Sequence, residues 1–477
     1  MLGEMSRWVI RKESEGSLVI QAHDSKVAHL RRYNAGKVRL TLPFGHALPP
    51  HLEDLVDLAL TVYAVDRLIR RRPPGREAIH RGQRWWQRHL EIHMPVSSPE
   101  NWSRPKVHEL LSDALGFLTE DRWDFVFVPR SSPVVRRPVQ RVLFPPEPPV
   151  RTALFSGGLD SLAGLSIQLG QMDSGTMTLV TLSTSSRLLK MQRQLLERVH
   201  LKTQARVVPV ILPVRLGQDR RGYDQNERSQ RTRGFCFSVC GVVAALMAGG
   251  DELTIFENGI GSLNLPISAA QLGAQSTRST HPVALSKLEQ FLHVLLGGEF
   301  RLRLPFLFST KGEMCRRLLG SRFADLGLET VSCDGFPPRL PGPVQCGTCT
   351  SCLLRRQALW VAGFFGDREP GRYRRDVVTD PSAIAAGNLA PLCDTLTQVS
   401  TLERASLSTT PWINLAIEFP DLVEVRDVVS EWLSPVARKE IEERLTTLYA
   451  TYCREWRQFP ARPPGWALGT GDLRLTA

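Results

Sequence analysis

Residues 153–164, ALFSGGLDSLAG, decide the fold of the central part of the chain. An apolar run ends at Ser156-Gly157-Gly158, and a helical pattern follows directly. Adjacent glycines permit positive φ, so their N–H groups can form a nest for an anion, and the helix start adds positive partial charge. Ser-Gly-Gly alone fits an ordinary glycine turn without a ligand better than it fits a phosphate site. In the full order of strand, turn and helix, these residues predict a phosphate cradle at the carboxyl end of a strand.

Short apolar runs alternate with helix-length segments from residue 150 onward. The runs are RTALF, TMTLVTL, RVVPVIL and ELTIFENG, and the segments between them are SLAGLSIQLGQ, RLLKMQRQLLERVHL and GFCFSVCGVVAALMAG. This alternation predicts an α/β fold, a doubly wound parallel sheet with helices on both faces. The last segment is apolar nearly all round, which predicts a buried helix.

The regions on either side follow other patterns. Residues 54–69 are spaced as an amphipathic helix, KVRLTLPF, HLEIHMPV and WDFVFV alternate as strands, and residues 133–150 are a proline-rich linker or arm. Residues 437–456 have a helical pattern. The expected division is an N-terminal α+β region that docks a partner (1–149), the parallel-sheet domain (150–360) and a mainly helical C-terminal region (361–477).

Composition indicates a folded protein without a membrane span. The chain has 477 residues, 42% of them hydrophobic, and no apolar run of about 18 residues. The first residues lack the apolar core of a signal peptide, so we expect a cytoplasmic protein. A net charge of +12 permits an anionic partner such as a nucleotide, tRNA or an acidic protein.

Four of the nine cysteines lie close together. They are Cys333, Cys346, Cys349 and Cys352, spaced C-x12-C-x2-C-x2-C. Without an export signal, such a cluster favours a metal site over disulfides. Four thiolates suit tetrahedral Zn²⁺, with Gly347 in the sharp turn, and they also suit an iron–sulfur cluster. We favour structural zinc, and sulfur ligation alone leaves the metal open.

The string S-G-G-x-D-S after a strand resembles the PP-loop of the ATP pyrophosphatase family. In that family the loop holds the pyrophosphate of ATP while an oxygen of the substrate attacks the α-phosphorus, giving an adenylate and pyrophosphate. The resemblance implies that ATP binds at residues 156–161, which are Ser156, Gly157, Gly158, Leu159, Asp160 and Ser161. It also implies that Asp160 is a magnesium ligand or an orienting carboxylate, with Ser161 beside it.

The loop and the cysteine cluster together resemble the QueC-like, or 7-cyano-7-deazaguanine synthase, family over about residues 150–360. LPFLFSTKGEM (304–314) matches the family's segment around a lysine, here Lys311, and QRTRGFCF (230–237) matches its helix start with an arginine, here Arg233. Both cations are expected to neutralise phosphate charge. Each has a plainer interpretation, because a cation at a helix start can simply face solvent. The implied cofactors are ATP, Mg²⁺ and Zn²⁺.

Two departures from the synthase pattern point to a subgroup. Ser183-Thr184-Ser185-Ser186 replaces the family's aspartate and Gly-Gln stretch, and residues 257–282 differ from its substrate loop. Extra regions flank the domain, as in the QueC-like proteins of anti-phage defence operons such as Qat and CBASS. We expect four residues of the 257–282 segment to bind a purine-like acid: Glu257, Asn258, Arg278 and His281. A turn-forming Asn and a packed His are the alternatives.

The resemblance implies that the chain adenylates a 7-deazaguanine carboxylic acid and transfers the acyl group to an amine on a protein of the same operon. The alternative acceptor is ammonia, as in the synthase. A non-catalytic scaffold that keeps the fold is another alternative, and it would need a broken glycine loop.

A PP-loop tRNA-modifying enzyme is a further alternative. The stretch Arg67–Arg88, with Trp85 and Trp86, fits RNA binding, protein docking or a solvated surface, and we favour protein docking over nucleic acid. A thiolase would need a reactive cysteine. Cys236, Cys240 and Cys315 lie in apolar helical segments and are expected in the core.

Overall fold

The computed structural model describes most of the chain. The described residues are 7–12, 17–23, 30–34, 48–71, 87–131, 148–172, 174–214, 227, 229–267, 277–336, 343–364, 372–433 and 436–462. Three features considered in the sequence fall wholly or mainly outside them: the strand predicted in KVRLTLPF, the proline-rich stretch after residue 132, and Trp85 with Trp86.

The N-terminal region contains a mixed five-stranded sheet in the order β3-β2-β1-β4-β5. Its strands are β1 (Arg7–Lys12), β2 (Ser17–His23), β3 (Leu30–Asn34), β4 (His89–Val96) and β5 (Arg122–Pro129). Its helices are α1 (Pro50–Leu68), α3 (Pro99–Trp102) and α4 (Pro105–Thr119). β1, β4 and β5 pair in parallel, while β2 is antiparallel to both its neighbours. The predicted α+β character of this region is therefore present, including the helix and the two predicted strands that the structure describes.

The second sheet is wholly parallel, with the order β10-β9-β6-β7-β8. Its strands are β6 (Val150–Leu154), β7 (Thr176–Ser183), β8 (Arg206–Pro213), β9 (Glu252–Ile255) and β10 (Arg301–Arg303). All of β7 is buried, as in a strand covered on both faces. The chain runs outward from β6 to β8 on one side and then to β9 and β10 on the other. This order creates a switch point between β6 and β9, where open α/β sheets bind ligands.

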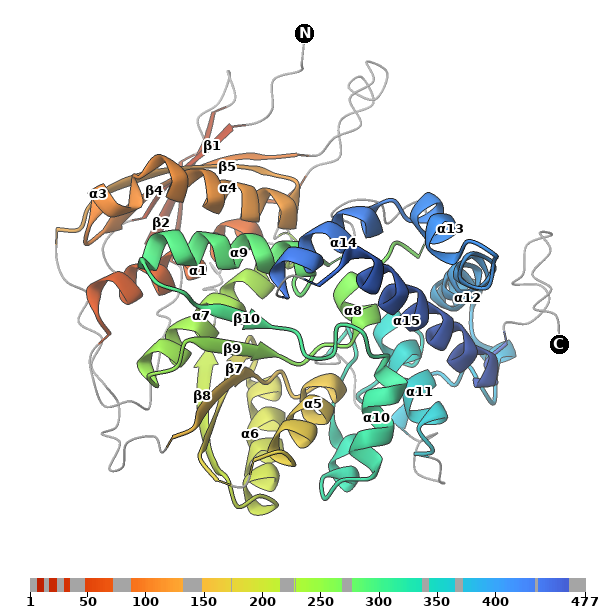
Figure 1. Ribbon diagram of the computed structural model, residues 1–477. Coiled ribbons are helices and arrows are strands. Elements are labelled where there is room, and N and C mark those ends of the chain that lie inside the picture. Colours follow the sequence, from red (N-terminus) through yellow and green to blue (C-terminus); the bar gives the residue numbers. More distant parts are fainter. Residues whose placement is uncertain are drawn as a thin grey trace, which may run out of the picture.

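Helices cover both faces of the second sheet, as the alternating pattern predicts (Figure 1). Those that follow its strands are α5 (Leu159–Leu169), α6 (Ser186–Leu201), α7 (Arg233–Met247), α8 (Gly259–Leu263), α9 (Pro282–Leu296) and α10 (Lys311–Leu319). The apolar side chains of α5 and α6 pack with one face, and those of α7 and α9 with the other. α1 packs on α7 and α4 packs on α9, so these two pairs of helices lie between the two sheets (Figure 1).

The C-terminal part is helical. Its helices are α11 (Thr350–Val361), α12 (Ala386–Ser406), α13 (Pro411–Glu418), α14 (Asp421–Trp432) and α15 (Arg438–Gln458). α14 packs on α9, and α15 contacts α8 and α11. One hydrophobic cluster runs from Ile10 through the α7–α9 layer to Trp456. Because it joins residues from all three expected regions, the boundaries at 149 and 360 stay a prediction.

Candidate functional site

The glycine turn lies between β6 and α5, as the opening motif predicts. Gly157 has φ +81°, a backbone conformation that L side chains rarely adopt, and a Cβ on it would lie close to the end of the Met191 side chain, at 3.1 Å from its Sδ. Gly158 N donates to Ser156 Oγ at 3.2 Å, and Ser161 Oγ donates to the Gly158 carbonyl at 2.8 Å. These bonds hold the turn in one shape at the start of α5, where helical N–H groups lack intrahelical acceptors.

Gln192 supports the turn from behind, although nothing in the sequence marked it. It lies on α6, it is fully buried, and its Nε2 donates to the carbonyl of Ser156 at 2.9 Å. A glutamine in an amphipathic helix is ordinary, so only the tertiary structure shows this role.

An ammonium–carboxylate pair lies beside the turn. Lys311 Nζ is 2.5 Å from Asp160 Oδ2, and both residues are buried, at 6% and 9% exposure. Asp160 is in the first turn of α5 and Lys311 is the first residue of α10. Burial acts to lower the pKa of Lys311, but the charges of Asp160 and Glu257 outweigh it and raise that pKa. The lysine is therefore held as a cation at this edge of the sheet.

Asn258 and Glu257 complete the cluster from the end of β9. The buried Asn258 Nδ2 donates to Glu257 Oε1 at 3.0 Å and approaches Asp160 Oδ1 at 3.4 Å. Its Oδ1 accepts from Gly261 N at 3.0 Å and so caps α8, which also fits the turn-forming interpretation. Glu257 as a whole is partly accessible, but the protein removes most of the water around its carboxyl group. This desolvation, and then the charge of Asp160, raise the pKa of Glu257 to about 8.

The other predicted substrate residues lie against the N-terminal region. Arg278 Nη1 donates to the carbonyl of Phe117 on α4 at 3.1 Å, and the guanidinium lies 4.7 Å from the centre of that ring. His281 is buried with its ring centre 5.4 Å from the same phenylalanine. These contacts match the packed-residue alternative, and the role of both side chains in substrate binding stays a prediction.

Arg233 is the first residue of α7, as predicted, with a partly exposed side chain. Burial raises the pKa of Tyr63 on α1, and Arg67 and Arg233 act against that rise, so Arg233 lies near this tyrosine. The helix start lies at the carboxyl edge of the sheet, because α7 follows β8. The structure thus places Arg233 at the predicted edge, and its contact with a nucleotide stays a prediction.

The four clustered cysteines come together in space as predicted. Their Sγ atoms all lie within 4.8 Å of one another, and those of Cys346 and Cys352 are 3.8 Å apart. Zn–S bonds of about 2.3 Å in a tetrahedron place the sulfurs about 3.8 Å apart. The peptide N–H groups of Thr348 and Cys349 donate to Cys346 Sγ, which favours a thiolate. The cluster can therefore hold a metal such as zinc.

The cysteine loop is joined to the glycine turn. Val331, two residues before Cys333, donates its N–H to the Gly157 carbonyl at 3.3 Å. Arg355 is fully buried on α11, where its guanidinium donates to Thr330 Oγ1 at 2.6 Å and to the Gly327 carbonyl at 3.1 Å. A metal bound by the cysteines would thus also restrain the segment before Cys333, which is hydrogen-bonded to the glycine turn.

These residues form a site suited to an anionic ligand: a glycine turn, the buried ammonium of Lys311 and the carboxyl groups of Asp160 and Glu257, all at the switch point of the sheet. Within the described residues, no helix is both long and apolar enough to cross a bilayer. We compared the chain with family models and with curated proteins, and neither comparison found a match.

Proposed function

We propose that this protein is an AMP-forming ligase that activates a carboxylic acid with ATP and transfers the acyl group to an amine. The observation that supports this most is the meeting of the glycine turn with the Asp160–Lys311 pair at the switch point between β6 and β9. A phosphate group in the turn would lie beside a buried cation, in a place of low dielectric where its charge counts most.

In the first step, a carboxylate oxygen of the acid attacks the α-phosphorus of ATP. The bond from that phosphorus to the bridging oxygen breaks, and pyrophosphate leaves with the electron pair. The N–H groups of the turn and the Lys311 ammonium stabilise the charge that develops on pyrophosphate. Asp160 orients the ammonium. Magnesium bound with ATP would add positive charge, and Asp160 is the carboxylate that would hold it.

In the second step, the amine nitrogen attacks the acyl carbon, the carbon–oxygen bond to AMP breaks, and AMP leaves. The amine must lose a proton to give a neutral amide. Glu257 lies at the same edge of the sheet, bonded through Asn258 beside Asp160, and its carboxyl pKa of about 8 leaves a fraction of it ionised at neutral pH, in the form that accepts a proton. We assign Glu257 the role of proton acceptor in this step.

We propose a 7-deazaguanine carboxylic acid as the substrate and an amine of a partner protein from the same defence operon as the acceptor. Two features support this choice: the pairing of an S-G-G-x-D-S turn with a four-cysteine loop, and the large regions on both sides of the parallel sheet. Ammonia is the alternative acceptor. It would give the primary amide, and a second activation of that amide by ATP would remove its oxygen to give the nitrile.

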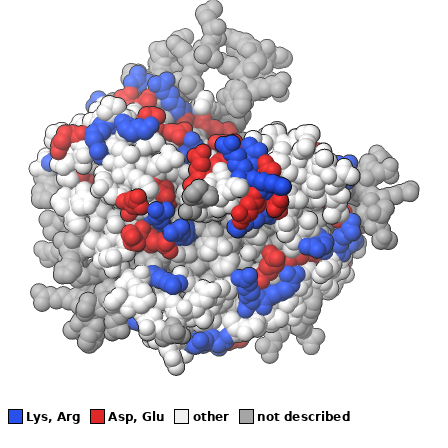
Figure 2. Space-filling model, in the orientation of Figure 1, with Lys and Arg blue, Asp and Glu red and all other residues white. Residues whose placement is uncertain are grey.

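The tRNA-thiolase alternative receives less support from the described residues. Cys236, Cys240 and Cys315 are buried in the core as predicted, and burial raises the pKa of Cys315 to about 12, which disfavours its thiolate. On the face drawn in Figure 2, basic and acidic side chains are interspersed rather than gathered into one basic surface. The described part of the Arg67–Arg88 stretch makes internal contacts, which are analysed below.

The test is to incubate the protein with magnesium, ATP and 7-carboxy-7-deazaguanine, with ammonium or with the proteins of its operon as acceptor. We expect AMP and pyrophosphate in equal amounts, and an added mass on one protein by mass spectrometry. Nitrile without a protein adduct would favour the synthase reaction. ADP and phosphate as products would contradict attack at the α-phosphorus.

A further inference from the structure

The helices α7 and α10, which follow strands of the second sheet, begin in the same way. Neither the glycine-turn motif nor the cysteine motif includes the residues involved. Arg233 of α7 follows the N-cap residue Thr232, and Lys311 of α10 follows the N-cap residue Thr310. In both cases the threonine hydroxyl donates to a buried carboxylate from a flanking region of the chain. We propose that Arg233 is a second cation of the site beside Lys311, and that the two carboxylates, Asp66 and Glu455, are positioning residues for Arg233 and Lys311 respectively. This inference rests on the proposed function.

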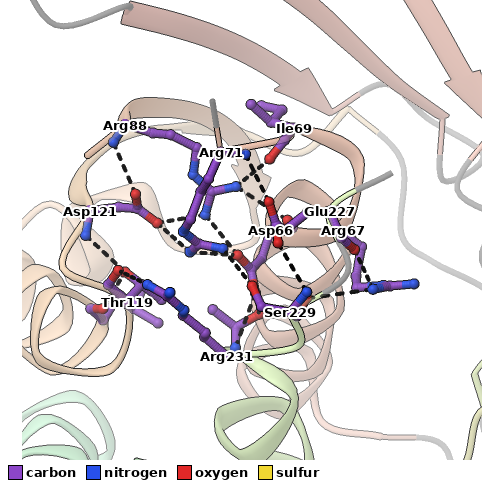
Figure 3. Close-up of polar contacts among 12 residues, drawn as sticks. Asp66, Arg67, Ile69, Arg71, Arg88, Thr119, Asp121, Glu227, Ser229 and Arg231 are labelled. Carbon is purple, nitrogen blue, oxygen red and sulfur yellow. Dashed lines mark hydrogen bonds and ion pairs between the residues drawn. The ribbon is translucent and has the colours of Figure 1, made fainter. Parts of the chain in front are cut away.

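The carboxylate on the N-terminal side is Asp66, on α1 (Figure 3). Its Oδ2 accepts from the Oγ1 of Thr232 at 3.1 Å and from the N–H of the same residue at 3.2 Å. Its Oδ1 accepts from Arg88 at 2.7 Å and from Arg71 at 2.9 Å. Burial opposes its ionisation, but Arg88 and Arg71 hold the pKa of Asp66 below its ordinary value. An ionised carboxylate therefore lies at the start of α7.

The described residues just before α7 are also bonded to the N-terminal region (Figure 3). Glu227 Oε2 accepts from the N–H of Arg71 at 2.8 Å, and Arg231 donates to the Thr119 carbonyl at 3.1 Å. Gln230 Oε1 accepts from the hydroxyl of Tyr63 at 3.1 Å. Because residues before the helix are fixed in this way, the position of Arg233 depends on α1 and on the end of α4.

The carboxylate on the C-terminal side is Glu455, on α15. Its Oε1 accepts from Thr310 Oγ1 at 2.9 Å and from Arg316 at 3.0 Å, and the residue is 2% exposed. Gly312 makes room for it, since a Cβ there would lie 2.4 Å from the same oxygen. Thr310 also accepts from the N–H of Glu313 at 3.1 Å, which closes a capping box next to Lys311.

Asp66 and Glu455 give the N-terminal and C-terminal regions a common role. Neither carboxylate bonds directly to Arg233 or Lys311 in the contacts described above. Each bonds to the residue just before the cation, where a displacement of the backbone would move the cation relative to the glycine turn. A displacement of about 1 Å can cost about two orders of magnitude in rate when catalysis depends on alignment.

The test measures the affinity of α,β-methylene-ATP with magnesium, by calorimetry, because this probe cannot release pyrophosphate. On the N-terminal side, Thr232→Val removes the hydroxyl and leaves Asp66 with its arginine partners, while Thr232→Ser keeps the bond. On the C-terminal side, Glu455→Ala removes the acceptor and Glu455→Gln keeps it. Each variant is also made in a second background, Arg233→Met for Thr232 and Lys311→Met for Glu455, and its melting temperature is measured.

We expect Thr232→Val and Glu455→Ala to weaken binding about tenfold, because the displaced cation loses about one hydrogen bond to the phosphates, and the conservative variants to stay within about twofold. In the background that lacks the corresponding cation, the same substitutions should change affinity by less than about twofold. Equal losses in both backgrounds, or no loss in either, would overturn the positioning role. Failure of the unmodified chain to bind the probe would instead refute the proposed function.

Discussion

Asp160 is the residue on which the proposed chemistry depends most. It contacts Lys311 directly and lies near the amide of Asn258, so it links the glycine turn to the ends of two other segments. We expect Asp160→Asn to keep the shape of the side chain, to lower the stability of the fold because the buried Lys311 loses its charged partner, and to slow AMP formation about 100-fold, as loss of an aligned charged group does.

The matched control is Asp113→Asn, at an exposed carboxylate that pairs with Lys287 on the surface. Pyrophosphate release, followed with a coupled phosphatase, should be unchanged in this variant. Asp160→Asn with unaltered turnover would show that the carboxylate is not part of the reaction.

His281 gives a prediction on pH. Its Nδ1 has no partner among the described residues, and burial, together with Arg278, lowers its pKa to about 3. The ordinary value is 6.5, so at mildly acidic pH the unfolded chain binds a proton that the folded chain excludes. Stability from this group is present above that ordinary value and falls as the pH falls toward the folded-state value.

We expect His281→Phe to remove this pH dependence. Between pH 7 and pH 5, the free energy of unfolding of the natural chain should fall by about 2 kcal/mol relative to the variant. Urea unfolding at several pH values measures the difference, and the exposed His200→Gln is the control. Parallel curves for the natural chain and His281→Phe would show that the ring already titrates normally in the fold.

At the scale of elements, the cysteine loop depends on one glycine. Gly347 has φ +86°, and a Cβ there would lie 2.0 Å from the carbonyl oxygen of Arg375. We expect Gly347→Ala to displace Cys346 and Cys349 and to lower the zinc bound per chain to well below one, as measured by elemental analysis. Gly335→Ala, in the same loop and with 3.8 Å to its nearest atom, should keep its zinc. Full zinc in both variants would contradict this account of the loop.

The strands and helices of the second sheet could largely be predicted, because their signals are local. Apolar runs and glycine punctuation are enough to indicate β6, β7, β8 and β9 together with α5, α6 and α7. β10 was missed because its three residues, Arg-Leu-Arg, carry no strand pattern and, within the described part of the chain, pair with β9 alone. The N-terminal sheet was predicted only in part, since β1 and β2 have mixed polar composition.

The same distinction applies to the site. A short motif indicates Asp160, and the ends of apolar runs indicate Glu257 and Asn258. No pattern indicates Gln192 or Glu455, and the spacing Thr310-x-x-Glu313 indicates only a helix start; the roles of these residues come from contacts across 36 to 145 positions in the chain. Buried polar residues of this kind can be recognised only when the partner is known.

At the scale of the whole molecule, buried charges anchor the N-terminal region. Asp121 accepts from Arg88 at 2.5 Å and from Arg71 at 2.6 Å, and its side chain is inaccessible to solvent. Removing one partner of a buried network leaves the others uncompensated. We expect Asp121→Ala to lower the free energy of unfolding by about 3–5 kcal/mol, measured by urea denaturation.

Asp113→Ala removes an exposed ion pair and should change the free energy of unfolding by less than about 1 kcal/mol. An equally small effect for Asp121→Ala would mean that the buried network contributes little to stability. The network also limits the docking interpretation of the Arg67–Arg88 stretch, because both described ends of that stretch are bonded inside the protein.

The central claim is that a carboxylate oxygen of the substrate attacks the α-phosphorus of ATP. The most direct measurement uses 7-carboxy-7-deazaguanine with a heavy oxygen isotope in its carboxylate, together with ATP, magnesium and an amine acceptor. Mass spectrometry of the products should find one labelled oxygen in the phosphate of AMP and none in pyrophosphate. Unlabelled AMP, or label in any other phosphate, would contradict the claim.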